Sequence, residues 1–455
     1  MKIFIILLGL YFSINPSMVH AQPITGNWHG ILNAGTVKLP LVLHIQHSGN
    51  ALSSTLDSPA QGANGINVDE TNFVDSVLTF NIKQINASYK GKFVADSIIG
   101  TFTQMGRDMP LTFKKGESKP LLRPQTPKPP FNYNIAEVSF INPLQQNTLA
   151  GTLTTPMDKT NFPVIVMITG SGAQDRDETL FEHKPFWVIA DYFAKKGIGV
   201  LRLDDRGVGE SSAGKKDPSS ADFTTDIEAA VNYLRKLGYK KIGLLGHSEG
   251  GMIAPIVAAH NKHVKFLISL AGPGIKIDSL YKLQIGAVVK SSGGTEEDAV
   301  EAVEQTGKII DAINQYKGDV LKAELRATIL AGIKDSTMAK QMGATVDASV
   351  KTYSSNWFTY FLQFDPAVYI QKLKIPVLAL NGSLDVQVTP KENLAGWRTL
   401  LQKAKNKKFT IIEVPGANHL FQQAKTGSVG EYGTIEQTFD PKVLDTMANW
   451  ILGLK

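Results

Sequence analysis

The sequence predicts a two-part protein: a small all-β domain, then an α/β domain with a doubly wound, mostly parallel sheet and a helical insertion. Three observations predict this. The early part of the chain contains only short β-rich runs, a proline-rich stretch follows them, and strand and helix patterns then alternate. The chain has 455 residues, which at about 150 residues per domain suits two or three domains.

Composition places the chain among ordinary globular proteins. Apolar residues make up 43% of it and charged residues 19%. It contains no cysteine, which excludes disulfides, a thiolate nucleophile and a cysteine metal site. The formal charge of +6 is spread along the chain, and its densest lysine cluster, residues 403–409, is interpreted as the exposed end of a helix. We therefore expect no nucleic-acid partner.

Residues 1–21 are interpreted as a secretory signal peptide. Lys2 precedes an apolar run, and Val19 and Ala21 occupy the two positions that a signal peptidase reads. The apolar run is too short to cross a bilayer, which takes about twenty residues. We expect cleavage after Ala21, export to the periplasm or beyond, and no stable membrane insertion of the mature chain.

Residues 22–118 predict a small all-β barrel or sandwich. Runs such as LPLVLHIQHSG and ASYKGKFVADSIIGTFTQ alternate in polarity, as half-buried strands do, and turn residues separate them. This region has only Trp28 as tryptophan and no dense aromatic platform for a glycan. His44 and His47 lie three residues apart on one predicted strand, so they face opposite sides and do not suit a metal site.

Residues 119–130 are expected to form a proline-rich linker, because X-Pro pairs favour extended backbone. The catalytic domain is expected at 131–455. Its strand candidates are AEVSFI, TLAGTLTTP, FPVIVMIT, GIGVLRLD, KIGLLG, VKFLISLA, IPVLALNG and KFTIIEVPG. Continuous apolar runs such as VIVMI suit central strands buried on both faces. Residues 275–365 show helical spacing instead, and we interpret them as an insertion that is either a lid or surface decoration.

The stretch KIGLLGHSEGGMIAPIVAAH has the pattern of a nucleophile elbow. A predicted strand leads into it, a predicted helix leaves it, and Ser248 lies between Gly246 and Gly250. A serine at such a turn needs small neighbours, because other side chains would collide with the adjacent strand and helix. Ser248 is therefore predicted to be a catalytic nucleophile.

A serine hydroxyl needs a base to take its proton. The chain has nine histidines. One lies in the expected signal peptide, three lie in the β-domain, and three lie in the elbow or beside the helix that follows it, which leaves His183 and His419. His419 follows the last predicted strand and is the predicted base. Asp385, after the penultimate strand, is the predicted acid, with Asp365 as the fallback. The order Ser248, Asp385, His419 matches the order serine, acid, histidine of one known fold.

Charge that develops on a substrate carbonyl needs prepositioned donors. We expect the backbone amides of Ser171, in TGSGAQDRDE, and of Glu249, directly after the nucleophile, to supply them. The charged stretches at residues 174–178 and 204–211 lie at the same edge of the predicted sheet. They are expected either to shape the rim of a pocket or to hold their loops through internal salt bridges.

The motifs TGSGAQDRDE, LRLDDRGVGES, GHSEGG, NGSLDVQV and GANHLF, in this order, resemble the α/β-hydrolase superfamily over residues 131–455. Within it the chain resembles secreted bacterial esterases related to the prolyl-oligopeptidase and dienelactone-hydrolase branches. Thr169 departs from the pattern, because many relatives have histidine there. The resemblance implies the α/β-hydrolase fold and a serine esterase that cleaves small carboxylic esters through an acyl-enzyme.

Two other functions stay open. A serine peptidase could use the same triad, with Glu178 or Glu249 holding a substrate amine. The β-domain could instead bind glycan or cell-wall material, with hydrolysis secondary. No cofactor or metal is expected, because no H-E-x-x-H motif occurs and GSGAQDRD lacks the third glycine of a dinucleotide loop. The sequence leaves the oligomeric state open.

Overall fold

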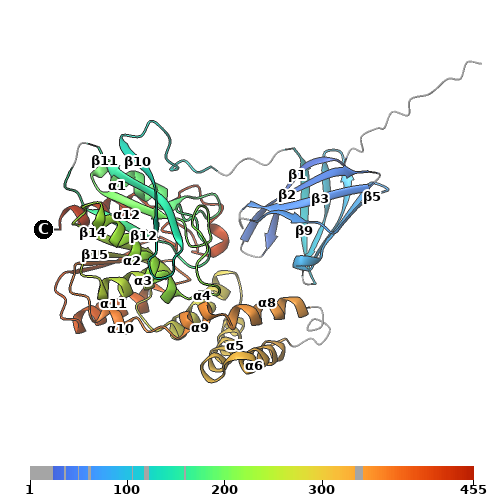
Figure 1. The fold of residues 1–455 in the computed structure, drawn as a ribbon. Helices are drawn as coiled ribbons and strands as arrows, with labels where there is room; N and C mark the ends of the chain where they lie inside the picture. Colours follow the sequence, from blue (N-terminus) through green and yellow to red (C-terminus); the bar gives the residue numbers. More distant parts are fainter. Residues whose placement is uncertain are drawn as a thin grey trace, which may run out of the picture. The chain divides into compact units, whose positions relative to one another are not determined.

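The computed structural model describes residues 24–34, 37–49, 51–59, 63–104, 106–116, 122–157, 160–333 and 342–454. The expected signal peptide lies outside these residues. The chain forms two compact units, one from the β-rich part and one from the remainder (Figure 1), and each has its own buried core. None of the helices in the described part of the chain combines the length and apolar character that a membrane crossing requires.

The first unit is a nine-stranded sheet in the order β4-β3-β2-β1-β9-β8-β7-β6-β5, and its described pairings are antiparallel. Its strands are β1 (Gly26–Ala34), β2 (Val37–Ser48), β3 (Ala51–Ser58), β4 (Ala63–Asn67), β5 (Glu70–Val74), β6 (Val77–Ile82), β7 (Ala87–Val94), β8 (Ser97–Gln104) and β9 (Arg107–Lys115). The sheet curls on itself, because Oγ of Ser54 on β3 lies 2.5 Å from Oγ1 of Thr71 on β5. The stacked rings of Phe80 and Tyr89 lie in its core.

The second unit contains an eight-stranded mixed sheet in the order β10-β11-β13-β12-β14-β15-β16-β17. Its strands are β10 (Tyr133–Ile141), β11 (Thr148–Pro156), β12 (Val164–Ile168), β13 (Gly199–Leu203), β14 (Ile242–His247), β15 (Val264–Leu270), β16 (Val377–Gly382) and β17 (Phe409–Val414). β10 pairs antiparallel with β11, and β11 pairs antiparallel with β13. The six neighbouring strands β13-β12-β14-β15-β16-β17 pair parallel. All eight predicted strands are present, and the predicted fold class is confirmed.

Helices cover both faces of this sheet (Figure 1). They are α1 (Pro185–Lys196), α2 (Ser220–Lys236), α3 (Glu249–His260), α11 (Pro390–Lys403) and α12 (Pro441–Leu452). One buried cluster joins α1 and α12 to the sheet through residues such as Phe193 and Met447. The other joins α2, α3 and α11 to it through Ile227, Val257 and Trp397. Strands buried on both faces explain the continuous apolar runs in the sequence.

The helical insertion lies between β15 and β16. Its described helices, in yellow to orange in Figure 1, are α4 (Ile277–Ser291), α5 (Glu296–Gln315), α6 (Gly318–Ala331), α8 (Gly343–Tyr353), α9 (Asn356–Leu362) and α10 (Ala367–Ile370). Thr295 begins α5 with a capping box, in which its hydroxyl accepts from the amide of Asp298. The insertion has its own apolar core, which includes Met252 and Ile256 of α3. It is therefore packed on the helix that follows Ser248.

Part of the expected linker is bound to the surface of the second unit. The guanidinium of Arg123 donates hydrogen bonds to the backbone carbonyls of Phe181, Gly433 and Ile435 at 2.7 to 3.2 Å. The side-chain oxygen of Gln125 accepts from backbone amides at residues 438 and 439. These contacts fix the chain as it enters β10.

We predict that Arg123→Ala lowers the free energy of unfolding of the second unit by about 2 kcal/mol, because charged hydrogen bonds to several carbonyls are lost. Arg123→Lys should recover only part of this, because an ammonium lacks the planar fork that reaches separate carbonyls. Calorimetric melting of the full chain measures both variants. An unchanged melting midpoint in Arg123→Ala would contradict the prediction.

Candidate active site

The predicted elbow is a strained turn between β14 and α3. Ser248 has φ 52° and ψ −116°, in a region that residues other than glycine rarely occupy. Its amide donates to the carbonyl of Leu270 at 2.9 Å, which ties the turn to the neighbouring strand β15. A Cβ at Gly246 would lie 2.0 Å from the carbonyl oxygen of Gly250, and one at Gly250 would lie 2.2 Å from that of Ile168. Both glycines are therefore needed for the turn.

The predicted acid and base lie together beside this turn. Nδ1 of His419 is 2.8 Å from Oδ2 of Asp385, and both side chains are buried. The other oxygen of Asp385 accepts from the amides of Gln387 and Val388, both at 2.8 Å, so the carboxylate is held in place. The His419 ring packs with its centroid 4.9 Å from that of His247, the residue before Ser248.

The remaining acid and base candidates are engaged elsewhere. His183 is buried, and its nitrogens contact the hydroxyl of Thr438 at 2.8 Å and the carbonyl of Tyr432 at 3.1 Å. Burial, together with the nearby positive charge of Arg123, lowers the pKa of His183 to about 4. Asp365 accepts from a backbone amide at the start of α10. Neither side chain takes part in the Ser248 constellation.

Ser248 opens into a cavity of about 490 Å³. The predicted oxyanion residues Ser171 and Glu249 line the same cavity, so the structure brings all three together. The insertion supplies most of the opposite wall, including five aromatic side chains: Tyr281, Tyr353, Trp357, Phe358 and Phe361. The insertion is therefore a lid over the candidate site rather than remote decoration.

The loop from Thr169 to Glu178, here called the oxyanion loop after its predicted role, lies against Ser248. A Cβ at Gly170 would be 3.3 Å from Cβ of Ser248. The Gly170 amide donates to Oε1 of Glu178 at 2.7 Å, so it is committed to that carboxylate. Ser171 supplies the next amide along the loop. The Glu249 amide lies in the first turn of α3, where backbone N–H groups have no acceptor within the helix.

His247 and Glu178 form a buried pair next to the candidate triad. Nδ1 of His247 is 2.9 Å from Oε1 of Glu178, and Nε2 is 3.0 Å from the carbonyl oxygen of His419. A carbonyl can only accept, so Nε2 carries a proton. Burial lowers the pKa of His247, but the charge and hydrogen bond of Glu178, the His419 carbonyl and Asp385 outweigh it and raise that pKa overall.

Two more carboxylates, the buried Glu249 and the partly buried Asp205, line the neighbouring cavity. Glu249 accepts from the Ser220 hydroxyl at 2.6 Å and from Nε1 of Trp357 at 2.9 Å, and burial raises its pKa. Asp205 accepts from the Thr169 hydroxyl at 2.8 Å. Burial raises the pKa of Asp205 to about 7; hydrogen bonds from Gln174 and Thr169 oppose the rise, and the charges of Glu178 and Glu249 add to it.

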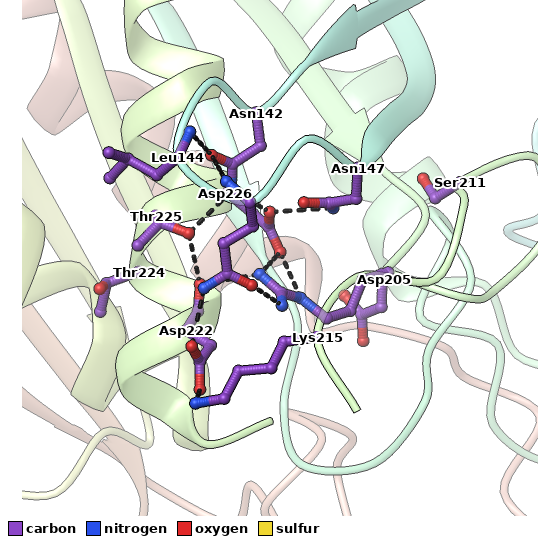
Figure 2. Close-up of polar contacts among 12 residues, drawn as sticks. Asn142, Leu144, Asn147, Asp205, Ser211, Lys215, Asp222, Thr224, Thr225 and Asp226 are labelled. Atoms are coloured by element: carbon purple, nitrogen blue, oxygen red, sulfur yellow. Dashed lines mark hydrogen bonds and ion pairs between the residues drawn. The ribbon is translucent and has the colours of Figure 1, made fainter. Parts of the chain in front are cut away.

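The charged loops are held by internal ion pairs, and some of their residues also line a second cavity. Arg176 pairs with Asp204 at 2.6 Å, and Arg206 pairs with Asp226 at 2.7 Å. In Figure 2 the side chains of Asn142 and Asn147 converge on the same Asp226 carboxylate, at 2.7 and 3.2 Å. Residues 204–206, together with Glu249 and apolar side chains, line a cavity of about 270 Å³. The charged loops therefore do both things that the sequence suggested as alternatives: internal salt bridges hold them, and they line part of a pocket.

Within the described ranges, no group of three or more histidine, aspartate or glutamate side chains is arranged to hold a metal ion. The carboxylates near Ser248 are instead bonded to donors of the protein itself.

Comparison with known families agrees with this geometry. A model of the alpha/beta hydrolase fold family matches residues 163–423, more than half of the chain, and the match includes Ser248, Asp385 and His419. The chain belongs to the alpha/beta hydrolase fold family.

Curated proteins similar to this chain include an esterase and a proline iminopeptidase. The chain is 27% identical to esterase EstD of Thermotoga maritima over 311 residues, which are 67% of this chain and 66% of EstD, just under two thirds of its length. It is 24% identical to a proline iminopeptidase of Lactobacillus helveticus over 278 residues, 58% of this chain and 85% of that one. Among solved structures, an esterase of Pyrococcus furiosus matches 74% of this chain and 98% of its own, at 14% identity and a TM-score of 0.45.

The pair of Glu178 and His247 is not predictable from sequence pattern alone. His247 directly precedes Ser248, and neighbouring side chains diverge at such an elbow, so the ring of His247 was not expected to act on the Ser248 hydroxyl. Its ring indeed bonds to Glu178 on one side and to the His419 carbonyl on the other. Glu178 has φ 52° in an irregular loop, where periodicity gives no register. The one feature of the sequence that pointed to Glu178 was the high density of acidic residues in QDRDE, which follows shortly after Ser171.

Asp205 should make the stability of this alpha/beta hydrolase depend on pH. Its folded-state pKa of about 7 lies above the ordinary pKa of 3.8, so folding favours the protonated form and stability is lost as pH rises between these two values. We predict that wild type loses up to about 3 kcal/mol of unfolding free energy between about pH 5 and pH 8, relative to Asp205→Asn. Urea denaturation at both pH values measures this difference.

Asp204→Asn is the matched control. Burial raises the pKa of Asp204, but the hydrogen bonds and charge of Arg176 lower it overall, so its contribution is lost only at acid pH. The change in unfolding free energy between about pH 5 and pH 8 should be the same in this variant as in wild type. Parallel curves for wild type and Asp205→Asn would contradict the assignment of the raised pKa to Asp205.

Proposed function

We propose that this protein is a serine esterase that hydrolyses small carboxylic esters through an acyl-enzyme. In this proposal Ser248 is the nucleophile, His419 the base, and Asp385 the acid that orients it. The amides of Ser171 and Glu249 form the oxyanion hole. The observation that carries the proposal is the buried hydrogen bond from His419 to Asp385 beside the strained turn at Ser248.

The chemistry proceeds in two halves. Oγ of Ser248 attacks the ester carbonyl carbon while Nε2 of His419 takes its proton, and the tetrahedral oxyanion receives hydrogen bonds from the two amides. Asp385 accepts from Nδ1 of His419 and stabilises the imidazolium that forms. Collapse breaks the bond to the alcohol, which leaves with the proton from His419. Water then attacks the acyl-enzyme, again with His419 as base, and releases the acid.

The engagement of the nearby glutamates favours an esterase over a peptidase. A peptidase that recognises a free amine needs a carboxylate presented to it. Glu178 is bonded to His247 and to the Gly170 amide, and Glu249 to Ser220 and Trp357. The similarity to proline iminopeptidase and the place of Glu249 on the cavity wall keep the peptidase as the second candidate.

The third candidate, a glycan-binding protein, receives less support. Trp28 is fully buried, and its indole N–H donates to the carbonyl of Ile24 at 2.7 Å. The tryptophan of the β-rich unit is therefore part of its core rather than of a binding surface.

The site of action belongs to the proposal as well. We place the mature protein outside the cytoplasm, in the periplasm or in the medium, on the sequence pattern around Lys2 and Ala21. The kinship to the prolyl-oligopeptidase and dienelactone-hydrolase branches rests likewise on the sequence motifs. No nucleic acid, metal or cofactor enters the proposed reaction.

We predict that the purified protein releases p-nitrophenol from p-nitrophenyl esters and that Ser248→Ala abolishes this release. Without the hydroxyl no acyl-enzyme forms, and loss of a triad nucleophile costs about 10⁶-fold in kcat. An aminoacyl-nitroanilide is the control substrate. Cleavage of the anilide at a rate comparable to the ester would favour the peptidase, and ester release that persists in Ser248→Ala would contradict the proposal.

We also predict that kcat/KM rises from acetate to butyrate to hexanoate esters, by about fourfold per methylene, because each methylene is buried against the apolar wall. Trp357→Ala should flatten this series, because it removes the largest of the wall's aromatic rings. Trp357→Phe should keep much of the slope while losing the hydrogen bond to Glu249. A series that is flat in wild type would show that the acyl group binds elsewhere.

A further inference from the structure

We propose that Glu178 and His247 form a positioning pair that holds the oxyanion loop and the loop carrying His419 against Ser248. The inference rests on the proposed serine hydrolase function and deepens it. Neither side chain would touch the reacting atoms. The pair would act through the three segments that it joins.

One carboxylate oxygen makes the first link. Oε1 of Glu178 accepts from the Gly170 amide at 2.7 Å and lies 2.9 Å from Nδ1 of His247. Glu178 is only 2% exposed, and the pair is not accessible to bulk water. The same atom therefore fastens the start of the oxyanion loop to the last residue of β14, directly before the nucleophile.

The other imidazole nitrogen makes the second link. Nε2 of His247 donates to the carbonyl of His419 at 3.0 Å, and the two rings pack at 4.9 Å. This bond fixes the backbone of the proposed base, whereas Asp385 fixes its ring. The segments that carry the oxyanion amide, the nucleophile and the base are thus joined through two side chains.

The orientation of the Gly170 peptide explains why the first link matters. Its N–H donates to Glu178, and Ser171, which carries the next amide along the chain, lines the cavity. If the Gly170 bond is lost, the backbone at Gly170 can rotate and the adjoining Ser171 amide loses its fixed direction. An oxyanion donor contributes to rate only while it is held within about 0.5 Å of the productive geometry.

The shared oxygen also explains why a carboxylate is needed. A single oxygen can accept from both Gly170 and His247 when both are donors, as in an ion pair of carboxylate and imidazolium. The oxygen of an uncharged amide at position 178 could accept from both the Gly170 amide and Nδ1 of His247 only if the imidazole stayed protonated at both nitrogens. Burial opposes that protonation, and the charge of Glu178 is the main contribution that favours it.

The test uses the full-length protein with Glu178→Gln, His247→Asn and the double variant. The first readout is the rate at which a fluorophosphonate labels Ser248, since its phosphoryl oxygen occupies the oxyanion position and no natural substrate is required. The second is kcat and KM on an ester that wild type cleaves. Circular dichroism and the melting midpoint show whether each variant is folded at the assay temperature.

Asp440→Asn is the matched control. Asp440 is also a buried carboxylate, but it caps the start of α12 by accepting from the Lys442 amide at 2.7 Å. Asparagine is an equally good cap residue, so this variant neutralises a buried carboxylate whose other side-chain partner is Gln423 rather than Gly170 or His247. Asp440→Asn should react with the fluorophosphonate and hydrolyse the ester at wild-type rates.

We expect Glu178→Gln to lower the labelling rate and kcat by about 10²-fold, the effect of losing one oxyanion donor, with KM changed by less than about threefold. His247→Asn should lower the same two quantities. The double variant should lose no more than the worse single variant, because the two residues act as a unit. His247→Asn leaves Glu178 in place and carries the test if Glu178→Gln does not fold.

Wild-type rates in folded Glu178→Gln would overturn the inference. So would an equal loss in Asp440→Asn, a loss confined to KM, or losses that multiply in the double variant. Failure of the proposed function looks different: wild type itself would neither react with the fluorophosphonate nor cleave the ester.

Discussion

The close approach of β12, the turn at Ser248 and the start of α3 is the constraint on which the candidate site depends. A methyl group on Gly246 or Gly250 would lie about 2 Å from a backbone carbonyl oxygen. That packing forces Ser248 into a conformation that costs about 1 to 3 kcal/mol, and the sheet and α3 on either side hold it there. The same packing puts the Glu249 amide and the Ser248 hydroxyl at one cavity. The strained backbone thus brings the proposed nucleophile and one proposed oxyanion donor to the same cavity.

Buried carboxylates supply the second layer of the site. Asp385, Glu178, Asp205 and Glu249 are all buried or nearly so, and each accepts hydrogen bonds from a different segment. A buried charge is costly unless it is bonded, so each of them fixes the donors that satisfy it. Two of the four, Glu178 and Asp205, accept from backbone or side-chain donors of the oxyanion loop, and Glu249 lies on α3 itself. A loop whose polar groups were bonded to water would have to reorganise during the reaction. These buried hydrogen bonds instead hold the loop in place before substrate arrives.

The sequence predicted what periodicity and fixed turns determine. Eight strands were found from apolar runs, and the helical insertion from its apolar spacing. Ser248, Asp385 and His419 became candidates because each follows a predicted strand, and chain order then suggests their roles. The pair of Glu178 and His247 could not be found in this way. Its contacts span an irregular loop with Glu178 at positive φ, and such a loop has no repeat from which a side-chain direction can be derived. The attachment of Arg123 to distant carbonyls was missed because it depends on tertiary contacts 58 or more residues away.

The insertion connects substrate selection to this framework through Trp357. Its ring lines the cavity, and its indole N–H donates to the side chain of Glu249, whose backbone amide is a proposed oxyanion donor. A lid that only covered the cavity would need no such bond. Because the bond reaches the residue after Ser248, the position of α9 and the first turn of α3 are mechanically linked. The proposed division of work, with specificity on the helices and chemistry at the strand ends, follows from placing the insertion after β15 rather than within the sheet.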